Sequence, residues 1–416
     1  MKFRKHKNLK EVLLLSCLVL LLCTACGSLI IPEDVAMHTT AITDKTGTTD
    51  ISAPTSGVGD EAPDTTDPTE STAALETESP QESTTASEES SDEILPSEST
   101  EEKQEEPMIT DTTPFGLHGA LHVADGKLKD AHGADFQLYG MSTHGIAWYP
   151  QYICKETIQY LHEEYGVNCL RLAMYTAEYQ GYCTDGDKEY LKQLVKNGVD
   201  YATELGMYVI IDWHILSDNN PQNHKEEAKK FLGEMSETFK NQDNVLYEIC
   251  NEPNNTDWNS VKTYAEEVIP VIRANDPDAV VIVGTPTWSQ DLECPLGDPV
   301  GYDNLLYSLH FYAATHKDDL RERAQQCIDK GLPVFISEFG LCDASGNGWN
   351  DFDSAQKWLD MIEQNNLSFM CWALGNRNEA CCIILPDSDK LSQWDDGDLN
   401  ESGKWILNYF KNKKSE

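Results

Sequence analysis

From Pro114 onward, short apolar runs alternate with longer amphipathic segments. Eight of the runs are rich in β-branched, aliphatic and aromatic residues, which is typical of strands buried inside a sheet. The predicted strands are residues 136–141, 168–174, 208–214, 245–252, 279–284, 305–312, 334–339 and 367–374. Helices are predicted between them, for example at 153–165, 188–205, 226–241 and 260–274, with a last helix at about 403–410.

Strand and helix alternating eight times predict a parallel sheet with helices packed outside it. Eight roughly equal repeats favour closure into a single (β/α)8 TIM barrel over an open, doubly wound sheet. We assign this α/β domain to residues 113–416, a length that suits one such barrel. The rest of the chain has a different character.

The N-terminus has the features of a secretion signal, which we assign to residues 1–25. Five basic residues fall within the first ten positions, and an apolar run at 12–22 follows them. The run ends in Thr24-Ala25-Cys26-Gly27, which resembles a bacterial lipobox in which the cysteine is lipidated, although Cys23 stands where that pattern prefers Leu. The alternatives are an ordinary cleaved signal and an uncleaved anchor helix.

Residues 26–112 consist mainly of Ser, Thr, Glu, Asp, Pro and Ala. Between residues 27 and 112 there are 22 acidic residues and only two lysines, so this segment carries about half of the formal charge of -40. Such a composition cannot bury enough apolar surface to fold, and it predicts a disordered, self-repelling tether. The acidity argues against a nucleic-acid partner.

Polar and aromatic residues stand at or just beyond the ends of the predicted strands. They are His144, Arg171, His214, Glu252, Trp288, His310 with Tyr312, Glu338 and Trp372. Active sites of TIM barrels lie at the C-terminal ends of the strands, so these residues are expected to meet there. Two of them are glutamates, and a pair of carboxyl groups is what cleavage of a glycosidic bond requires.

The motifs around these residues resemble glycoside hydrolase family 5, in particular its bacterial endo-β-1,4-glucanases. The motifs are Ser142-Thr143-His144-Gly145 with Trp148, Arg171 to Tyr175, Asp212-Trp213-His214, Asn251-Glu252-Pro253, Trp288 to Asp291, His310-Phe311-Tyr312, Ser337-Glu338-Phe339-Gly340 and Trp372. The resemblance covers about residues 114–409. It implies a retaining hydrolase in which Glu252 is the general acid/base and Glu338 is the nucleophile.

The resemblance also implies roles for the neighbours of the two glutamates. Arg171 would keep Glu338 ionised, Tyr312 would donate a hydrogen bond to the same carboxylate, and Asn251 would contact the sugar 2-hydroxyl. Burial and the charge of Glu338 would keep Glu252 protonated.

Other residues are assigned to sugar binding. They are His144, Tyr175, His214 and His310, the stacking platforms Trp148, Trp288 and Trp372, and Glu379 with Arg377, which replaces the lysine common in the family. We expect no cofactor and no metal. The rival is a metal-dependent barrel hydrolase, but such enzymes usually begin with His-x-His on strand one and this chain has His144-Gly145-Ile146. The ten cysteines beyond residue 26 form no C-x-x-C pattern, and whether they form disulfides stays open.

The sequence therefore predicts a tethered endo-β-1,4-glucanase acting on cellulose or related β-glucans. The same chemistry on mannan, xyloglucan or mixed-linkage glucan is an alternative, and a non-catalytic carbohydrate-capture lipoprotein is another. We expect a monomer whose partners are a β-glucan polysaccharide and, through the lipid on Cys26, a membrane. Its expected location is the extracellular face of the bacterial membrane, or the medium if it is secreted.

Overall fold

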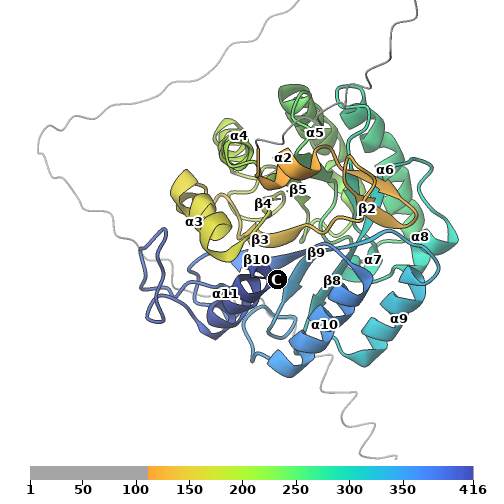
Figure 1. Ribbon diagram of the computed structural model, residues 1–416. Helices are drawn as coiled ribbons and strands as arrows, with labels where there is room; N and C mark the ends of the chain where they lie inside the picture. The colour runs from red at the N-terminus through yellow and green to blue at the C-terminus, as the bar shows by residue number, and fades with distance from the viewer. Residues whose placement is uncertain (1–110, 416) are drawn as a thin grey trace, which may run out of the picture. The chain divides into compact units, whose positions relative to one another are not determined.

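The computed structural model describes residues 111–415, and eight parallel strands in it close into a barrel (Figure 1). The strands are β3 (Tyr139–Thr143), β4 (Cys169–Tyr175), β5 (Tyr208–His214), β6 (Val245–Glu248), β7 (Val281–Val283), β8 (Leu305–Tyr312), β9 (Val334–Gly340) and β10 (Phe369–Leu374). Each strand pairs with the next one along the chain, and β10 pairs with β3 to complete the circle. The predicted (β/α)8 barrel is confirmed.

Side-chain alternation along β4 shows how the barrel is filled. Leu170, Leu172 and Met174 point outward into the hydrophobic layer shared with the helices. Arg171 and Tyr175 occupy the alternate positions, which face the barrel interior. All seven residues of the strand are buried, which explains why its sequence reads as a nearly continuous apolar run.

Helices surround the barrel in Figure 1. The long ones are α3 (Lys155–Tyr165), α4 (Lys188–Glu204), α5 (Lys225–Phe239), α6 (Trp258–Arg273), α9 (Asp318–Ile328), α10 (Phe352–Asn365) and α11 (Glu401–Lys414). The short ones are α2 (Pro114–His118), η1 (Pro150–Tyr152), η2 (Pro221–His224), α7 (Pro286–Ser289) and α8 (Glu293–Gly297). Asp187, Asp257, Asp351 and Asn400 cap α4, α6, α10 and α11 by accepting backbone N–H bonds, which satisfies donors that the first turn leaves unpaired.

A hairpin that the sequence analysis did not predict closes the N-terminal end of the barrel. Its strands β1 (His122–Ala124) and β2 (Lys127–Lys129) are antiparallel and joined by Asp125-Gly126, both at positive φ. Leu128 packs with Tyr208 and other residues at the lower ends of the strands. The opposite end, where the C-terminal strand ends meet, is the open one.

Strand β6 is shorter than the predicted strand at residues 245–252. We expected it to run to Glu252, but it ends at Glu248 because the regular alternation of its backbone hydrogen bonds breaks beyond that point. The N–H of Ile249 donates to Ile282 on one neighbouring strand, whereas the N–H groups of both Asn251 and Glu252 donate toward the other neighbour, at Trp213 and Ile215. This break in alternation reorients Glu252 relative to the strand.

Within residues 111–415, all ten cysteines are free thiols, and no helix is long and apolar enough to cross a bilayer. The predicted signal peptide, the lipidation site Cys26 and all but the last two residues of the predicted tether lie outside the described residues.

Candidate active site

A cavity of about 600 Å³ opens at the C-terminal ends of the strands. Twelve of the fourteen predicted site residues in the described chain line it: His144, Trp148, Tyr175, His214, Glu252, Trp288, His310, Tyr312, Glu338, Trp372, Arg377 and Glu379. The other two, Arg171 and Asn251, are not among its lining residues and are fully buried. The cavity therefore gathers residues from all eight strand ends or the loops that follow them.

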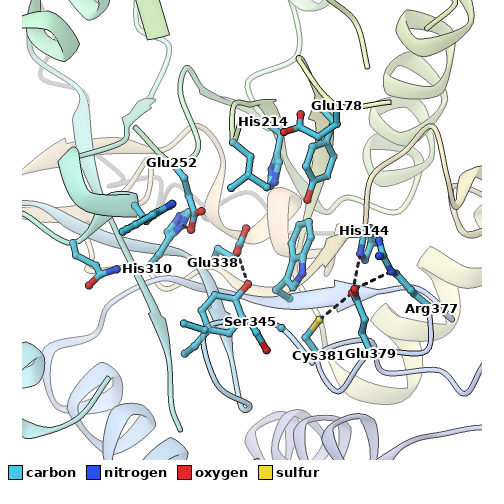
Figure 2. Close-up of a pocket in the computed structure, with 18 of the residues that line it drawn as sticks. His144, Glu178, His214, Glu252, His310, Glu338, Ser345, Arg377, Glu379 and Cys381 are labelled. Atoms are coloured by element: carbon cyan, nitrogen blue, oxygen red, sulfur yellow. Dashed lines mark hydrogen bonds and ion pairs between the residues drawn. The ribbon is translucent and has the colours of Figure 1, made fainter. Parts of the chain in front are cut away.

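The two predicted catalytic glutamates face each other across this cavity (Figure 2). Glu338 lies within β9, and Glu252 lies four residues beyond the end of β6. Oxygen atoms of the two carboxyl groups lie within 4.8 Å of each other, and a ring nitrogen of His310 lies within 4.8 Å of both. Both carboxyl groups are largely buried, so their ionisation is controlled by these neighbours rather than by water.

Glu338 is surrounded by donors. Tyr312 Oη donates to its Oε1 at 2.8 Å, and Arg171 Nη1 donates to its Oε2 at 3.2 Å. Burial alone would raise the pKa of Glu338, but the positive charges of His310 and Arg171 outweigh burial and hold it below the ordinary value. Glu338 is therefore kept as a carboxylate, the form that a nucleophile needs.

Glu252 has the opposite tendency. Burial and the negative charge of Glu338 raise its pKa above the ordinary value, although the hydrogen bond from His310 opposes them. His310 Nδ1 lies 2.9 Å from Glu252 Oε1, and its Nε2 lies 2.9 Å from Ser337 Oγ. Ser337 donates in turn to Glu248 Oε1 at 2.7 Å. Two carboxyl groups with pKa values displaced in opposite directions are the pattern of an acid and a nucleophile.

His310 itself is held as a cation. Burial would lower its pKa, but the carboxylates of Glu248 and Glu252 raise it to about 9. With both ring nitrogens protonated, His310 donates to Glu252 on one side and to Ser337 on the other. It thereby links the rim glutamate to a buried carboxylate beneath the cavity.

Arg171 forms the floor under the two glutamates. Its Nε donates to Glu248 Oε2 at 2.7 Å, and its Nη2 donates to Asn251 Oδ1 at 2.6 Å and lies 3.0 Å from Asp212 Oδ2. These carboxylates raise the pKa of Arg171 despite its complete burial. Arg171 thus acts through Glu338 and Asn251 rather than by lining the cavity.

Asn251 is oriented by the same network. Its Oδ1 accepts from Arg171, so its Nδ2 faces His214 Nε2 at 3.3 Å and the Ile215 carbonyl at 3.2 Å. The predicted contact of Asn251 with a sugar hydroxyl stays a prediction.

His214 is neutral, unlike His310. Burial and the nearby Arg171 lower its pKa to about 3. Because Asn251 donates to Nε2, the proton of the ring is on Nδ1, which donates to Asp212 Oδ2 at 2.6 Å. The ring stacks on Trp372 with 5.1 Å between centroids and packs against Tyr175 at 4.1 Å.

Aromatic rings form one wall of the cavity. Trp148 packs on Tyr175 with 4.6 Å between ring centroids, and its Nε1 donates to the Tyr179 carbonyl at 2.9 Å. Trp372 is nearly buried, yet one surface lines the cavity. Such flat apolar surfaces suit the CH faces of pyranose rings.

Trp288 stands on a different kind of support. It is 44% exposed, and the three consecutive residues Thr287, Trp288 and Ser289 all have positive φ. A left-handed conformation costs a non-glycine residue roughly 1–2 kcal/mol. The turn is held by the Trp288 N–H, which donates to the Pro253 carbonyl at 3.0 Å, and by Ser289 Oγ, which donates to the Asn251 carbonyl at 2.6 Å. Both acceptors flank Glu252.

Arg377 and Glu379 lie together at the far side of the cavity from Glu252 (Figure 2). Arg377 Nε is 2.8 Å from Glu379 Oε1, and His144 Nε2 is 3.6 Å from Glu379 Oε2. Arg377 and Glu379 therefore form an ion pair with each other, and the arginine is half exposed.

Several residues of the site received no role from the sequence. Glu178, Gln290 and His316 line the cavity from loops, where position in the sequence gives no signal. Asp212 and Glu248 lie in strands and face the barrel interior, and a charged residue inside an otherwise apolar strand is a signal that would have found them. Both are completely buried, and both contact Arg171.

Comparisons with known proteins agree with this geometry. A family model described as Cellulase (glycosyl hydrolase family 5) matches residues 129–378. Endoglucanase A of Butyrivibrio fibrisolvens is 45% identical over 321 residues, which are 76% of this chain and 74% of that protein. An endoglucanase of Clostridium saccharobutylicum is 45% identical over 299 residues, 71% of this chain and 65% of that protein, or slightly less than two thirds of its length.

A solved structure gives the same picture. The catalytic domain of Thermobifida fusca endoglucanase Cel5A superposes with a TM-score of 0.69 and is 35% identical. The match covers 72% of this chain and 99% of that chain.

Proposed function

This chain belongs to the cellulase family, glycosyl hydrolase family 5, and we propose that it is a retaining endo-β-1,4-glucanase acting on cellulose or related β-glucans. The observation that carries the proposal is the pair Glu252 and Glu338, whose carboxyl oxygens lie within 4.8 Å of each other and whose pKa values are displaced in opposite directions. Retaining glycosidases have carboxyl groups about 5–5.5 Å apart, whereas inverting ones need about 6.5–9.5 Å to accommodate a water molecule.

In the first step, Glu338 attacks the anomeric carbon while Glu252 protonates the departing glycosidic oxygen. The bond from the sugar to the leaving oxygen breaks, and a glycosyl ester with Glu338 forms. Tyr312 and Arg171 hold the attacking carboxylate in position, one on each oxygen. As Glu252 loses its proton, the adjacent imidazolium of His310 stabilises the carboxylate that results.

In the second step, Glu252 acts as a base. It takes a proton from water, the water oxygen attacks the anomeric carbon, and the ester with Glu338 breaks. The sugar is released with the configuration it had at the start. One carboxyl group can serve both steps because its proton leaves in the first step and returns in the second.

Three tryptophans that line the cavity, Trp148, Trp288 and Trp372, are proposed to bind successive sugar rings by stacking. Glu379 and Arg377 would accept and donate hydrogen bonds at a sugar distant from the cleaved bond. Arginine presents a planar fork where lysine presents a point charge, so this position is proposed to tune preference among glucans.

Two measurements test the function. Reducing-sugar release from carboxymethylcellulose, glucomannan and barley glucan, measured side by side, should be fastest on a β-1,4-glucan; a preference for glucomannan would move the proposal to a mannanase. Proton NMR of fresh product from a cello-oligosaccharide should show the β-anomer first. Early accumulation of the α-anomer would exclude the double-displacement mechanism.

We also propose that the enzyme is a lipoprotein, anchored through Cys26 at the extracellular face of the membrane with residues 26–112 as its tether. The support is the sequence Thr24-Ala25-Cys26 after an apolar run, together with the acidic composition that follows. Membrane fractionation in the native host tests this with Cys26→Ala and, as its matched control, Cys23→Ala. Only the first should release the protein; equal membrane retention of both would indicate an uncleaved anchor helix.

Because one chain supplies every residue of the site, we propose that the enzyme acts as a monomer. Light scattering of the purified protein at the concentration used for assays tests this. A dimer mass there would overturn it.

A further inference from the structure

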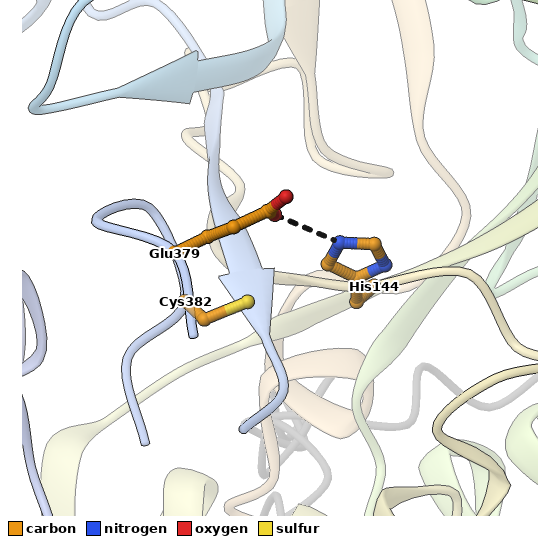
Figure 3. Close-up of side chains that lie close together, drawn as sticks. All are labelled: His144, Glu379 and Cys382. Carbon is orange, nitrogen blue, oxygen red and sulfur yellow. Dashed lines mark ion pairs between the residues drawn. The ribbon is translucent and has the colours of Figure 1, made fainter. Parts of the chain in front are cut away.

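Three side chains of different chemistry meet beside the sugar-binding wall (Figure 3). His144 follows β3, and Glu379 and Cys382 belong to the loop after β10. One possible ligand atom from each, a ring nitrogen, a carboxylate oxygen and the thiol sulfur, lies within 4.8 Å of the other two. Glu379 also lines the cavity, so the cluster is in contact with the cleft, although Cys382 is fully buried.

The two oxygens of Glu379 have unequal surroundings. Oε1 is paired with Arg377 Nε at 2.8 Å. Oε2 has only longer contacts, 3.6 Å to His144 Nε2 and 3.9 Å to Cys381 Sγ. The carboxylate is thus fixed by the arginine on one side and presents its other oxygen to the imidazole and the thiols.

We propose that His144, Glu379 and Cys382 bind one thiophilic divalent cation of the Zn²⁺ and Cd²⁺ class. A nitrogen, a carboxylate oxygen and a thiolate sulfur are ligands that Zn²⁺ accepts in one site, and the neighbouring Cys381 lines the cleft. Mg²⁺ and Ca²⁺ prefer oxygen ligands throughout and are not expected to bind.

Proton balance makes the site selective. The N–H of Gly145 donates to His144 Nδ1 at 2.7 Å, so the ring proton is on Nε2 and faces Glu379. Binding of a cation at Nε2 moves that proton to Nδ1, which removes the bond from Gly145, and the Cys382 thiol releases its proton to solvent. Only a cation with high affinity for thiolate can compensate for both changes.

Occupancy would act on substrate binding. If Glu379 contacts a sugar, as the proposed function holds, a cation that engages Glu379 and His144 competes with that sugar. The reacting carboxylates lie across the cavity and are not touched. We therefore expect Cd²⁺ to raise KM for a long cello-oligosaccharide by roughly tenfold, an effect of about 1.4 kcal/mol, with kcat unchanged.

Binding is tested on the full chain without any activity measurement. Titration with Cd²⁺ should produce a thiolate-to-Cd²⁺ charge-transfer absorbance, and that signal should be lost in Cys382→Ala. The matched control is Cys294→Ala, which removes one partly buried thiol on α8. Equal signals in the wild type and Cys382→Ala would overturn the proposal, and so would their absence from both. Because this readout needs no substrate, it separates failure of the site from failure of the proposed function.

A kinetic comparison tests the inhibition. Glu252, His310 and Glu338 also lie within 4.8 Å of one another, but they include no sulfur. A cation bound there would lower kcat and would inhibit Cys382→Ala as strongly as the wild type. That result would overturn the inhibitory role, whereas loss of the KM effect in Cys382→Ala alone, with Cys294→Ala still inhibited, would support it.

Discussion

His310 donates through Nδ1 to Oε1 of Glu252 at a distance of 2.9 Å, and this places a cation directly against the residue proposed as the acid. The hydrogen bond lowers the pKa of Glu252, in opposition to burial and the charge of Glu338. The imidazolium thus keeps the proton of Glu252 removable. It does so while being held charged by two carboxylates, with its own pKa at about 9.

We expect His310→Asn to slow the enzyme and change its pH dependence. Without the imidazolium the pKa of Glu252 rises further, so the basic limb of kcat/KM should move to higher pH. The second step, which needs Glu252 as a base, should slow by roughly tenfold or more. pH profiles on a cello-oligosaccharide measure both effects. The control is His122→Asn on the hairpin at the other end of the barrel, and an unmoved basic limb would contradict the assigned role of His310.

The two glutamates should respond differently to removal. Glu338→Gln should abolish turnover, because no nucleophile remains. Glu252→Ala should lose roughly 10²–10⁴-fold on cellulose but retain activity on aryl glycosides, whose leaving groups need little protonation. Azide should accelerate Glu252→Ala by attacking the ester in place of water. If azide fails and both variants behave alike, the roles are wrongly assigned.

Arg171→Lys should destabilise the fold although it preserves the charge. An ammonium group cannot replace the planar fork that reaches Glu248, Glu338 and Asn251 together, and disrupting a fully buried ion pair costs about 3–5 kcal/mol. Urea unfolding measures the loss. The control Arg323→Lys alters an exposed ion pair with Glu293. Its free energy of unfolding is expected to fall by about 0–1 kcal/mol. Equal losses would mean that Arg171 is not a structural centre.

Glu248 should contribute to acid stability. Although burial raises its pKa, Arg171 and His310 outweigh burial and lower it to about 2. A folded-state pKa below the unfolded value of about 4.5 gives stability that is complete above pH 4.5 and is lost as the pH falls toward 2. This pKa difference corresponds to a contribution on the order of 3 kcal/mol to the free energy of unfolding.

The variant Glu248→Gln tests this contribution. It should be less stable at neutral pH and should show a smaller further loss between pH 4.5 and 2 than the wild type. The comparison is made by urea unfolding at each pH, with surface Glu237→Gln as the control. Parallel losses in the wild type and Glu248→Gln would show that other carboxylates cause the acid sensitivity.

Much of this architecture was predictable because a strand buried on both faces has a nearly continuous run of apolar residues in the sequence. All eight strands were placed within a few residues, and β5 and β8 with both ends correct. The predicted end of β6 was wrong because the point at which its hydrogen bonds stop alternating depends on how neighbouring strands align, which the local sequence does not record. The hairpin was missed because each of its strands has only three residues, although Asp125-Gly126 is a turn signal.

The sequence indicated which residues form the site but not which of them line the cavity and which lie beneath it. Arg171 lies in the first half of β4 and Asn251 follows β6, and both lie beneath the cavity because the barrel stacks inward-facing residues at different depths. Glu178 and His316 come from loops whose paths no periodic pattern encodes. Which residues touch solvent and which support those that do is a property of the folded barrel.

The left-handed turn at Trp288 costs the folded protein stability, but it holds a ring that is proposed to bind sugar. Glycine would relieve the backbone at this position and remove the ring together with the strain. Sequence design guided by fold stability alone would therefore favour substitutions that remove the Trp288 ring from the cleft. Heat-tolerant variants of the enzyme should be sought elsewhere, at helix caps and loop positions that do not face the polymer.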